Sequence, residues 1–346
     1  MANAGAKDLP AKCSQILTRP RRSVTLANKM PTAVEFDKQI RAIHDADFKE
    51  FETEVVRQKA LSDRAAKFEK QREARRREFL KSIGVNLTNF DRENDKDQRA
   101  QEKELKAFVG EFTPKSIRRR SLQAADAKDA ALRSDALAST AHLVLPPYAS
   151  TIFAADRALI KDVGGEAGNG AINSGWVFPD EPGKIRIEDT SHNPVVCFQA
   201  VAESPPPEFN VHFAFIPATT ANYEMTAVLA FHGFYVLRSD DSWYNCRSAQ
   251  VQLKARMNVR QYVDFGWKDF PLLIDREESN AEEVTNYDRT GFFDYTTVLK
   301  GGDPVVVTFK GIVDAFARGG GAYAELNFEA GTANYIEPLL LSVNQV

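Results

Sequence analysis

Residues 209–216 have the sequence Phe-Asn-Val-His-Phe-Ala-Phe-Ile, in which large apolar side chains alternate with polar or small ones. Val211 and Phe213 fall on one side of an extended chain, whereas Asn210 and His212 fall on the other. A period of two residues is that of a β-strand with one face in a core. This stretch therefore predicts a strand of a sheet whose inner face is strongly apolar.

Similar strand-length segments fill the C-terminal half, separated by clusters of Pro, Gly, Asn and Asp. The other expected strands are residues 184–187, 195–202, 225–237, 250–259, 272–274, 292–299, 305–316, 322–328 and 336–343. Strands without intervening helices predict an all-β antiparallel sandwich, for which we expect a jelly-roll arrangement. The missing crossover helices exclude a parallel α/β sheet. The glycines of residues 318–321 predict a hairpin between the strands that they join.

The N-terminal part has the period of a helix instead. Thr32 and Glu35 have the spacing of a capping box, apolar residues then recur at helical offsets, and Gly84 follows as a C-terminal cap. Further helices are expected over residues 95–112 and 121–142. The second of these is rich in Ala, so we expect the helices to pack closely as an antiparallel bundle or coiled coil.

These patterns divide the chain into four regions, and the fold class is α+β with the two kinds of element segregated. Residues 1–30 are expected to form a flexible basic arm, and residues 31–145 a helical domain. Residues 146–175 are expected to be a linker, with a short helix near residues 152–161 and a Gly-rich hinge. Residues 176–346 are expected to form the β-sandwich.

The bulk composition limits the classes of function. The formal charge of −3 over 346 residues gives no global attraction for nucleic acid or for an anionic membrane. No apolar run approaches the roughly 18 residues that a membrane-spanning helix requires, and the first 30 residues lack the apolar stretch of a secretory signal. The three cysteines form no metal or disulfide motif. We therefore expect a cytoplasmic protein, or one within a virus-like particle.

Motifs of catalysis and metal binding are missing from the sequence. There is no Gly-x-Ser-x-Gly elbow, no His-Glu-x-x-His helix and no phosphate-binding Gly-rich loop. His212 and His232 would ligate a metal if their strands were neighbours, but no third ligand stands out, which favours a structural role. We therefore expect a protein that is not an enzyme and that holds no cofactor and no metal.

The best candidate for a binding site is the loop after the strand 225–237, because it combines acids, aromatic rings and an amide. Carbohydrate sites use this mixture, since aromatic faces stack on sugars while Asp and Asn hold the hydroxyl groups. The candidate residues are Asp240, Asp241, Trp243, Tyr244 and Asn245, with Trp267 as a second exposed aromatic. In the alternative interpretation the two tryptophans close the ends of the sandwich, and the two acids form a turn.

Two further candidates lie in basic segments. Arg19, Arg21 and Arg22 belong to the N-terminal arm, which is a solvated tail, contacts nucleic acid or a partner subunit, or is an organelle transit peptide. Ser121 follows three arginines, a pattern typical of sites for basophilic kinases, but it equally suits a helix N-cap.

A basic arm of residues 1–30 before a many-stranded β-domain resembles the layout of small viral capsid proteins, although the long intervening helices depart from it. The resemblance implies a structural subunit that assembles with copies of itself. The helical packing region, the Gly-rich hinge and the absence of catalytic motifs lead to the main hypothesis, a non-enzymatic, self-associating assembly protein. It would be a homo-oligomer, with nucleic acid as a further partner through the arm. The alternative is a lectin-like, glycan-binding module on a helical oligomerisation stalk.

Overall fold

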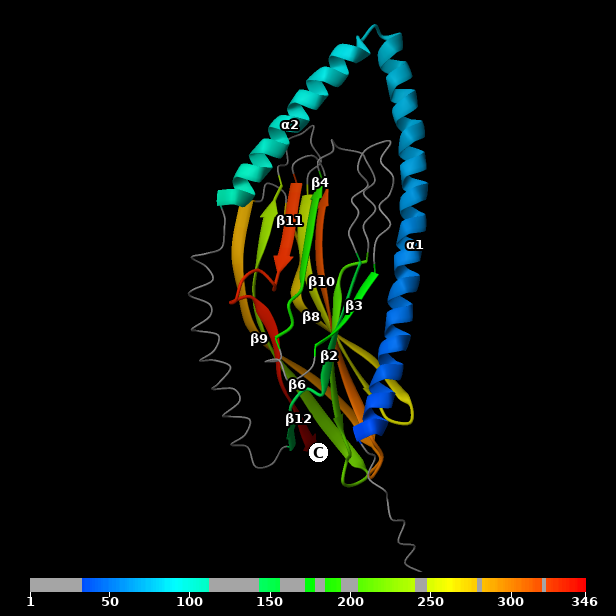
Figure 1. The fold of residues 1–346 in the computed structure, drawn as a ribbon, viewed down its shortest axis with the longest axis vertical. Helices are drawn as coiled ribbons and strands as arrows, with labels where there is room; N and C mark the ends of the chain where they lie inside the picture. Colours follow the sequence, from blue (N-terminus) through cyan, green and yellow to red (C-terminus); the bar gives the residue numbers. More distant parts are fainter. Residues whose placement is uncertain are drawn as a thin grey trace, which may run out of the picture. The chain divides into compact units, whose positions relative to one another are not determined.

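The computed structural model describes residues 33–111, 143–155, 172–177, 184–193, 205–239, 248–278, 282–318 and 322–346. In these ranges two helices are followed by twelve strands, which form two antiparallel sheets (Figure 1). The expected class, α+β with the helices first and a β-sandwich after them, is therefore confirmed. The expected third helix, residues 121–142, lies outside the described residues.

The two helices are α1, Ala33–Ser82, and α2, Leu87–Glu111. Gly84 ends α1 as predicted, with a φ of 85° that favours glycine and a backbone N–H that donates to the Lys81 carbonyl at 3.1 Å. The start of α2 was predicted eight residues too late, at Asp95. Asn86 is its N-cap, because its side-chain oxygen accepts the backbone N–H of Asn89 at 3.1 Å.

Two six-stranded sheets make up the rest of the described chain, and every strand pair in them is antiparallel. Sheet A contains β1 (Leu143–Leu145), β12 (Tyr335–Gln345), β6 (Ala221–Arg238), β11 (Ala322–Asn327), β4 (Glu188–Asn193) and β9 (Glu282–Leu299). Sheet B, in spatial order, contains β3 (Ile172–Val177), β2 (Ala149–Ala155), β5 (Glu208–Phe215), β10 (Val305–Arg318), β7 (Ser248–Arg260) and β8 (Asp264–Glu278).

The core lies between the two sheets and is built from the alternation that the sequence shows. Val211 and Phe213 of β5 are fully buried in it, together with apolar side chains from β6, β7 and β10. The rings of Phe293 in sheet A and Phe309 in sheet B meet at 4.6 Å between centroids and so connect the layers. Gly311 leaves space for the ring of Phe209, which any Cβ at that position would overlap.

Several local predictions are wrong, each because strand pairing overrides a local pattern. Residues 149–155 form strand β2, where a linker with a short helix was expected from about residue 152, and the end of the expected Gly-rich hinge forms β3. β2 lies between β3 and β5, so its extended form is stabilised by two ladders of hydrogen bonds. The expected strand 184–187 is reduced to a single bridge between Ile185 and Ile336.

The predicted hairpin at residues 318–321 is also wrong. β10 belongs to sheet B and β11 to sheet A, so the chain crosses between the sheets there. A Gly-rich connection permits a sharp change of direction in either case, and sequence alone does not tell the two apart.

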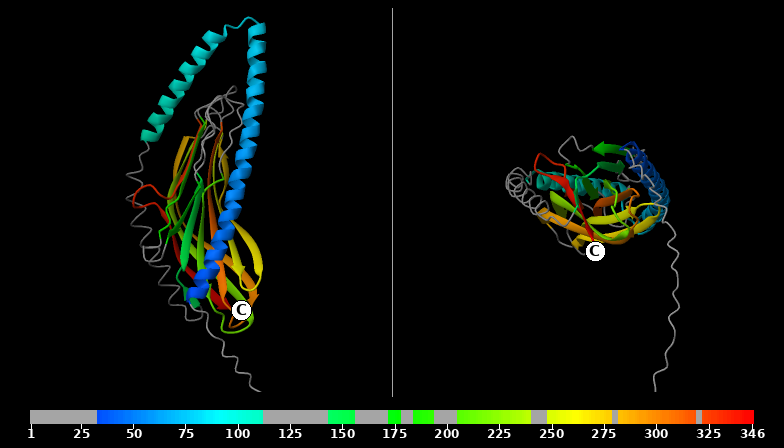
Figure 2. Two further views of the ribbon diagram at one scale, coloured as in Figure 1. Left: turned by 45° about the vertical axis from the view of Figure 1, so that its right-hand side comes forward. Right: turned by 90° about the horizontal axis from the view of Figure 1, so that it is seen from below.

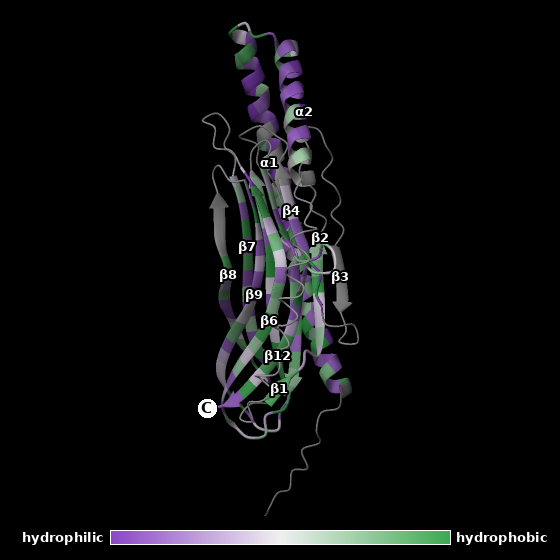
Figure 3. Cartoon of the chain, turned by 90° about the vertical axis from the view of Figure 1, so that its left-hand side faces the viewer, coloured by the Kyte–Doolittle hydropathy of each residue, from purple (hydrophilic) through white to green (hydrophobic). Residues whose placement is uncertain are grey.

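The first part of α1 lies beside the strands of sheet B, where it contacts β2 (Figures 1 and 2). Beyond that contact, most side chains of α1 are hydrophilic, as are those of α2 that the structure describes, whereas the strands carry the apolar residues (Figure 3). In the part of the chain that is described, no helix is apolar enough over a sufficient length to cross a membrane.

Candidate functional site

The outer face of sheet B carries polar side chains that are nevertheless buried. Asn210 and His212 of β5, Thr308 and Lys310 of β10, and Asn258 of β7 form this set, which we call the polar seam. The strand register places them side by side, with His212 opposite Thr308, Thr308 opposite Asn258, and Asn210 opposite Lys310. Burying a polar group without a hydrogen-bond partner destabilises the folded state. The seam is therefore the most unusual feature of the described residues.

Helix α1 is held at one end of the seam by apolar contacts. Phe51 of α1 is buried against Phe153 and Ala155 of β2, with Phe48 and Val55 packed at the edge. The ring of Phe153 lies 5.2 Å from His44 and 5.5 Å from Phe48 between centroids. These contacts position the polar residues of α1 over the neighbouring strands.

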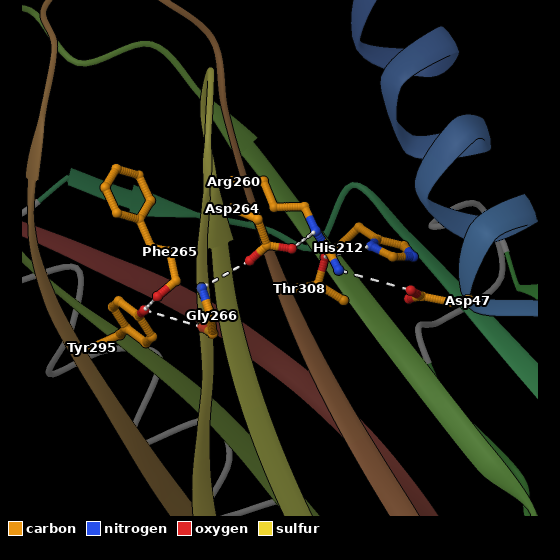
Figure 4. A network of polar contacts seen from close by, with 8 residues as sticks. All are labelled: Asp47, His212, Arg260, Asp264, Phe265, Gly266, Tyr295 and Thr308. Atoms are coloured by element: carbon orange, nitrogen blue, oxygen red, sulfur yellow. Dashed lines mark hydrogen bonds and ion pairs between the residues drawn. The ribbon is translucent and has the colours of Figure 1, made fainter. Parts of the chain in front are cut away.

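Arg260 of β7 is the centre of a network that connects α1 to sheet B (Figure 4). Its guanidinium lies 3.7 Å from the carboxylate of Asp47 on α1, and it donates to Asp264 at 3.2 Å and to Thr308 at 3.3 Å. The Thr308 hydroxyl in turn lies 3.1 Å from Nδ1 of His212. One cation therefore connects the helix with three strands.

The turn between β7 and β8 fixes the far side of this network. The backbone N–H of Gly266 donates to Asp264 at 2.8 Å. The hydroxyl of Tyr295 donates to the carbonyl groups of Phe265 at 2.9 Å and of Gly266 at 3.1 Å (Figure 4). Gly266 has a φ of 89°, a conformation in which other residues are strained. Asp264 is thus oriented toward Arg260 by backbone geometry.

Burial in the seam shifts protonation equilibria. Desolvation, with the nearby charges of Arg260, His44 and Lys310, lowers the pKa of His212 to about 3, so the ring is neutral at physiological pH. Burial raises the pKa of Asp47, although the positive charges of Lys310 and Arg260 oppose the change. Burial also acts to raise the pKa of Asp264, but the Gly266 N–H and Arg260 outweigh it, and the pKa is lowered.

Lys310 of the seam and two arginines of β7 surround Trp267 on β8. The indole ring has Arg256 at 5.3 Å, Arg260 at 5.4 Å and Lys310 at 5.4 Å from its centroid. Arg256 pairs with Asp269 at 2.7 Å, and Lys310 pairs with Glu208 at 2.9 Å. Because each cation has a carboxylate beside it, this cluster attracts anions only weakly.

Several buried atoms of the seam and of the residues next to it have no hydrogen-bond partner among the described residues. They include the side-chain amide of Asn210, the hydroxyl of Thr151, Nε2 of His212 and Oδ2 of Asp47. Each loses its hydrogen bonds to water on burial, at a cost of about 1–3 kcal/mol. The docking of α1 is therefore favoured by the apolar contacts and the Asp47–Arg260 pair, and opposed by these atoms.

The structure tests only some of the predicted site residues. Trp267 is described and half-buried, at the edge of the seam. Asp240, Asp241, Trp243, Tyr244 and Asn245 lie outside the described residues, as do Arg19, Arg21, Arg22 and Ser121. The loop of residues 240–247 joins β6 of sheet A to β7 of sheet B. Its proposed glycan contacts, and the nucleic-acid contacts of the arm, remain predictions.

The suggestion that His212 and His232 share a metal is wrong. His212 lies on β5 of sheet B and His232 on β6 of sheet A, so their strands are not neighbours. His232 lies 3.1 Å from Asp288 and His212 lies beside Thr308. Among the described residues, no group of three His, Cys, Asp or Glu side chains has the arrangement of a metal site.

Sequence reasoning missed Asp47, Arg260 and Lys310 as members of one cluster. The available signal was a polar residue within an apolar strand, as Lys310 is within Val305–Phe316. Asp47 gives no such signal, because an acid on a helix is ordinarily solvated. Only the docking of α1 brings it to the sheet.

No protein-family model and no curated protein matches the chain. Among solved structures, the chain is similar to TmCBM61, a carbohydrate-binding module in complex with β-1,4-galactotriose, at 9% identity and a TM-score of 0.18, over 48% of this chain and 93% of that one. It is also similar to the VP2 subviral particle of infectious bursal disease virus, at 9% identity and a TM-score of 0.13, over 58% and 57%. Likenesses this low carry no argument about function.

Proposed function

We propose that this chain is a non-enzymatic assembly subunit that associates with copies of itself through its helices and its β-sandwich. The observation that supports this most is the exposure of large apolar side chains along α1, including Leu61, Phe68 and Phe79, and of Ile83 directly after it. Exposed apolar side chains arranged along one element are typical of a surface that a partner covers. The same chain encloses a well-packed core, so this exposure is not the result of a shortage of interior space.

The strand order supports a jelly roll as the form of the sandwich. β4, β11, β6 and β9 form one four-stranded layer, because β11 pairs with β4 and β6, and β9 pairs with the other edge of β6. β5, β10, β7 and β8 form the facing layer. Eight strands that alternate between two sheets in this way have the connectivity of two Greek keys.

The ion pairs of the polar seam support a role that is not catalytic. Asp47, Glu208 and Asp269 each lie beside an arginine or a lysine, at 3.7, 2.9 and 2.7 Å respectively. A general base must place its oxygen against a substrate proton, whereas these carboxylates are engaged by cations of the same chain. Asp47 therefore suits the attachment of α1 to the sheet better than proton transfer, and Glu208 and Asp269 suit the joining of neighbouring strands.

Sedimentation tests the proposed function. Analytical ultracentrifugation of the full chain at micromolar concentration is expected to show species several times larger than the 38.6 kDa of one copy. The proportion of large species should rise with concentration, since association follows mass action. A single 38.6-kDa species over the whole micromolar range would contradict the proposal.

A second candidate function is glycan binding, which the half-exposed Trp267 beside Arg256 and Asp269 favours. A flat indole next to charged hydrogen-bonding groups is a common sugar platform. On a glycan array, Trp267→Ala is then expected to weaken binding by tenfold or more. Tyr262→Ala is the matched control, because Tyr262 is an exposed aromatic on the nearby turn. Binding that survives Trp267→Ala, or that never appears, would rule out this site.

A further inference from the structure

An apolar stripe runs along the part of α1 that follows its contact with β2 and ends at Ile83, the residue after the helix. Leu61, Phe68, Phe79 and Ile83 are separated by seven, eleven and four residues, each close to a whole number of helical turns. Their exposed fractions are 48%, 69%, 61% and 59%. The stripe therefore lies on one side of the helix, faces solvent within this chain, and spans roughly 33 Å at 1.5 Å per residue.

The charge around the stripe limits what can cover it. Residues 57–82 of α1 contain ten Lys or Arg against four Asp or Glu, an excess of six positive charges. Pairing this segment with the same segment of a second copy would bring two strongly positive helices together, which is unfavourable. A partner helix has to carry the opposite charge.

Helix α2 has that charge. It contains seven Asp or Glu against five Lys or Arg, and its 25 residues extend over roughly 37 Å, close to the length of the stripe. The chain already shows the pairing chemistry once, where Arg77 of α1 donates two hydrogen bonds to Asp91 of α2, at 2.9 and 2.7 Å. Phe90, which is partly exposed beside Asp91, offers an apolar contact on the same helix.

We propose that the apolar stripe of α1 binds α2 of a second copy, and that the second copy's stripe binds α2 of the first. This inference rests on the proposed function and names the surface by which two copies associate. Reciprocal pairing of this kind is self-complementary, as a two-fold symmetric interface must be. It would place four helices side by side and bury both stripes, which a single copy leaves exposed.

Removal of the stripe is the first test. The double variant Phe68→Ser, Phe79→Ser is expected to raise the dissociation constant for the first association step at least tenfold, measured by sedimentation of the full chain. The control is Val34→Ser, Val56→Ser, which removes two side chains of similar exposure, on the same helix but outside the stripe. The control should associate like the natural sequence, because its residues lie on other sides of the helix.

A charge exchange is the second test. Arg72→Glu with Arg75→Glu reverses the charge beside the stripe, and Asp95→Arg with Asp97→Arg reverses it on α2. Each variant alone is expected to associate at least tenfold more weakly, whereas an equimolar mixture should restore the complex. Restoration in the mixture requires contact between α1 of one copy and α2 of the other, because neither variant contains both reversed helices.

The outcomes separate this inference from the proposed function. If the natural chain is a monomer, the proposed function fails and the inference fails with it. If it forms large species that the stripe and exchange variants leave unchanged, only the inference fails. Binding of the stripe to vesicles rich in anionic lipid, without any effect of the variants on sedimentation, would likewise overturn it in favour of a membrane surface.

Discussion

Lys310→Met is expected to lower the free energy of unfolding by about 3–5 kcal/mol, the cost of leaving one member of a buried ion pair without its partner. The Lys310 side chain is only 9% exposed and that of Glu208 17%, and their charged atoms lie 2.9 Å apart. With methionine at position 310, the Glu208 carboxylate would stay in a poorly solvated place with no cation beside it. Urea denaturation, followed by circular dichroism, measures the change.

Two further variants identify the cause of that loss. Lys310→Met combined with Glu208→Gln should recover most of the stability, because no unpaired charge is then buried. Lys300→Met is the control, since Lys300 and Asp303 form a pair at 2.8 Å that is 60% and 37% exposed. Its loss should leave the free energy of unfolding almost unchanged, because solvent screens an exposed pair. Equal effects of Lys310→Met and Lys300→Met would show that burial of the first pair has no energetic weight.

Acidification is expected to destabilise the folded chain between about pH 6.5 and 5, through His212. The folded protein keeps this ring neutral, with a pKa of about 3 against an ordinary 6.5, whereas the unfolded chain takes up the proton below 6.5. The stabilising effect is therefore complete above pH 6.5 and decreases as the pH falls. The slope approaches about 1.4 kcal/mol per pH unit.

The charged and titratable groups that face His212 from α1, β7 and β10 determine how much folding stability is lost on acidification. Arg260 of β7, Lys310 of β10 and His44 of α1 all disfavour a positive ring. Asp47 of α1 acts in the opposite direction, because its pKa is raised and the folded chain takes up a proton there above pH 3.8. The loss should therefore be steepest well above pH 3.8 and weaken as that range is approached.

Denaturation curves at pH 7, 6 and 5 test the assignment to His212. His212→Asn should abolish most of the pH dependence, since the amide can keep a hydrogen bond to Thr308 but does not titrate in this range. Asp47→Asn should retain it, because the ring is still buried. An unchanged slope in His212→Asn would assign the pH dependence to another group.

The alternation of apolar and polar side chains was enough to predict most of the β half. Strands β5 to β7 and β10 to β12 occur where that pattern placed them, because a strand in a sandwich must direct every second residue into the core. Of β8 and β9, only residues 272–274 and 292–299 were expected to be strand. Helix α1 was likewise predictable from its period and from Gly84, whose left-handed conformation ends it. Both signals are local, so they are visible in the sequence alone.

The candidate site was much less predictable. The sequence distinguishes the inner Val211 and Phe213 from the outer Asn210 and His212, and the structure confirms that division. The sequence contains no sign that Asn210 and His212 are buried as well. His212 interacts electrostatically with His44 of α1, which lies more than 150 positions earlier in the chain.

Contacts between distant segments also explain why the sequence did not predict strand β2 or the surroundings of Trp267. Residues 149–155 are strand rather than helix because β3 and β5 pair with both of their edges. Trp267 lies among cations because β7 and β10 bring Arg256, Arg260 and Lys310 to the same face. The sequence by itself determined the class of each half and the inner faces of the strands, since periodicity is a property of neighbouring residues. The tertiary structure alone decided which polar faces are covered, because that depends on contacts between segments distant in the chain.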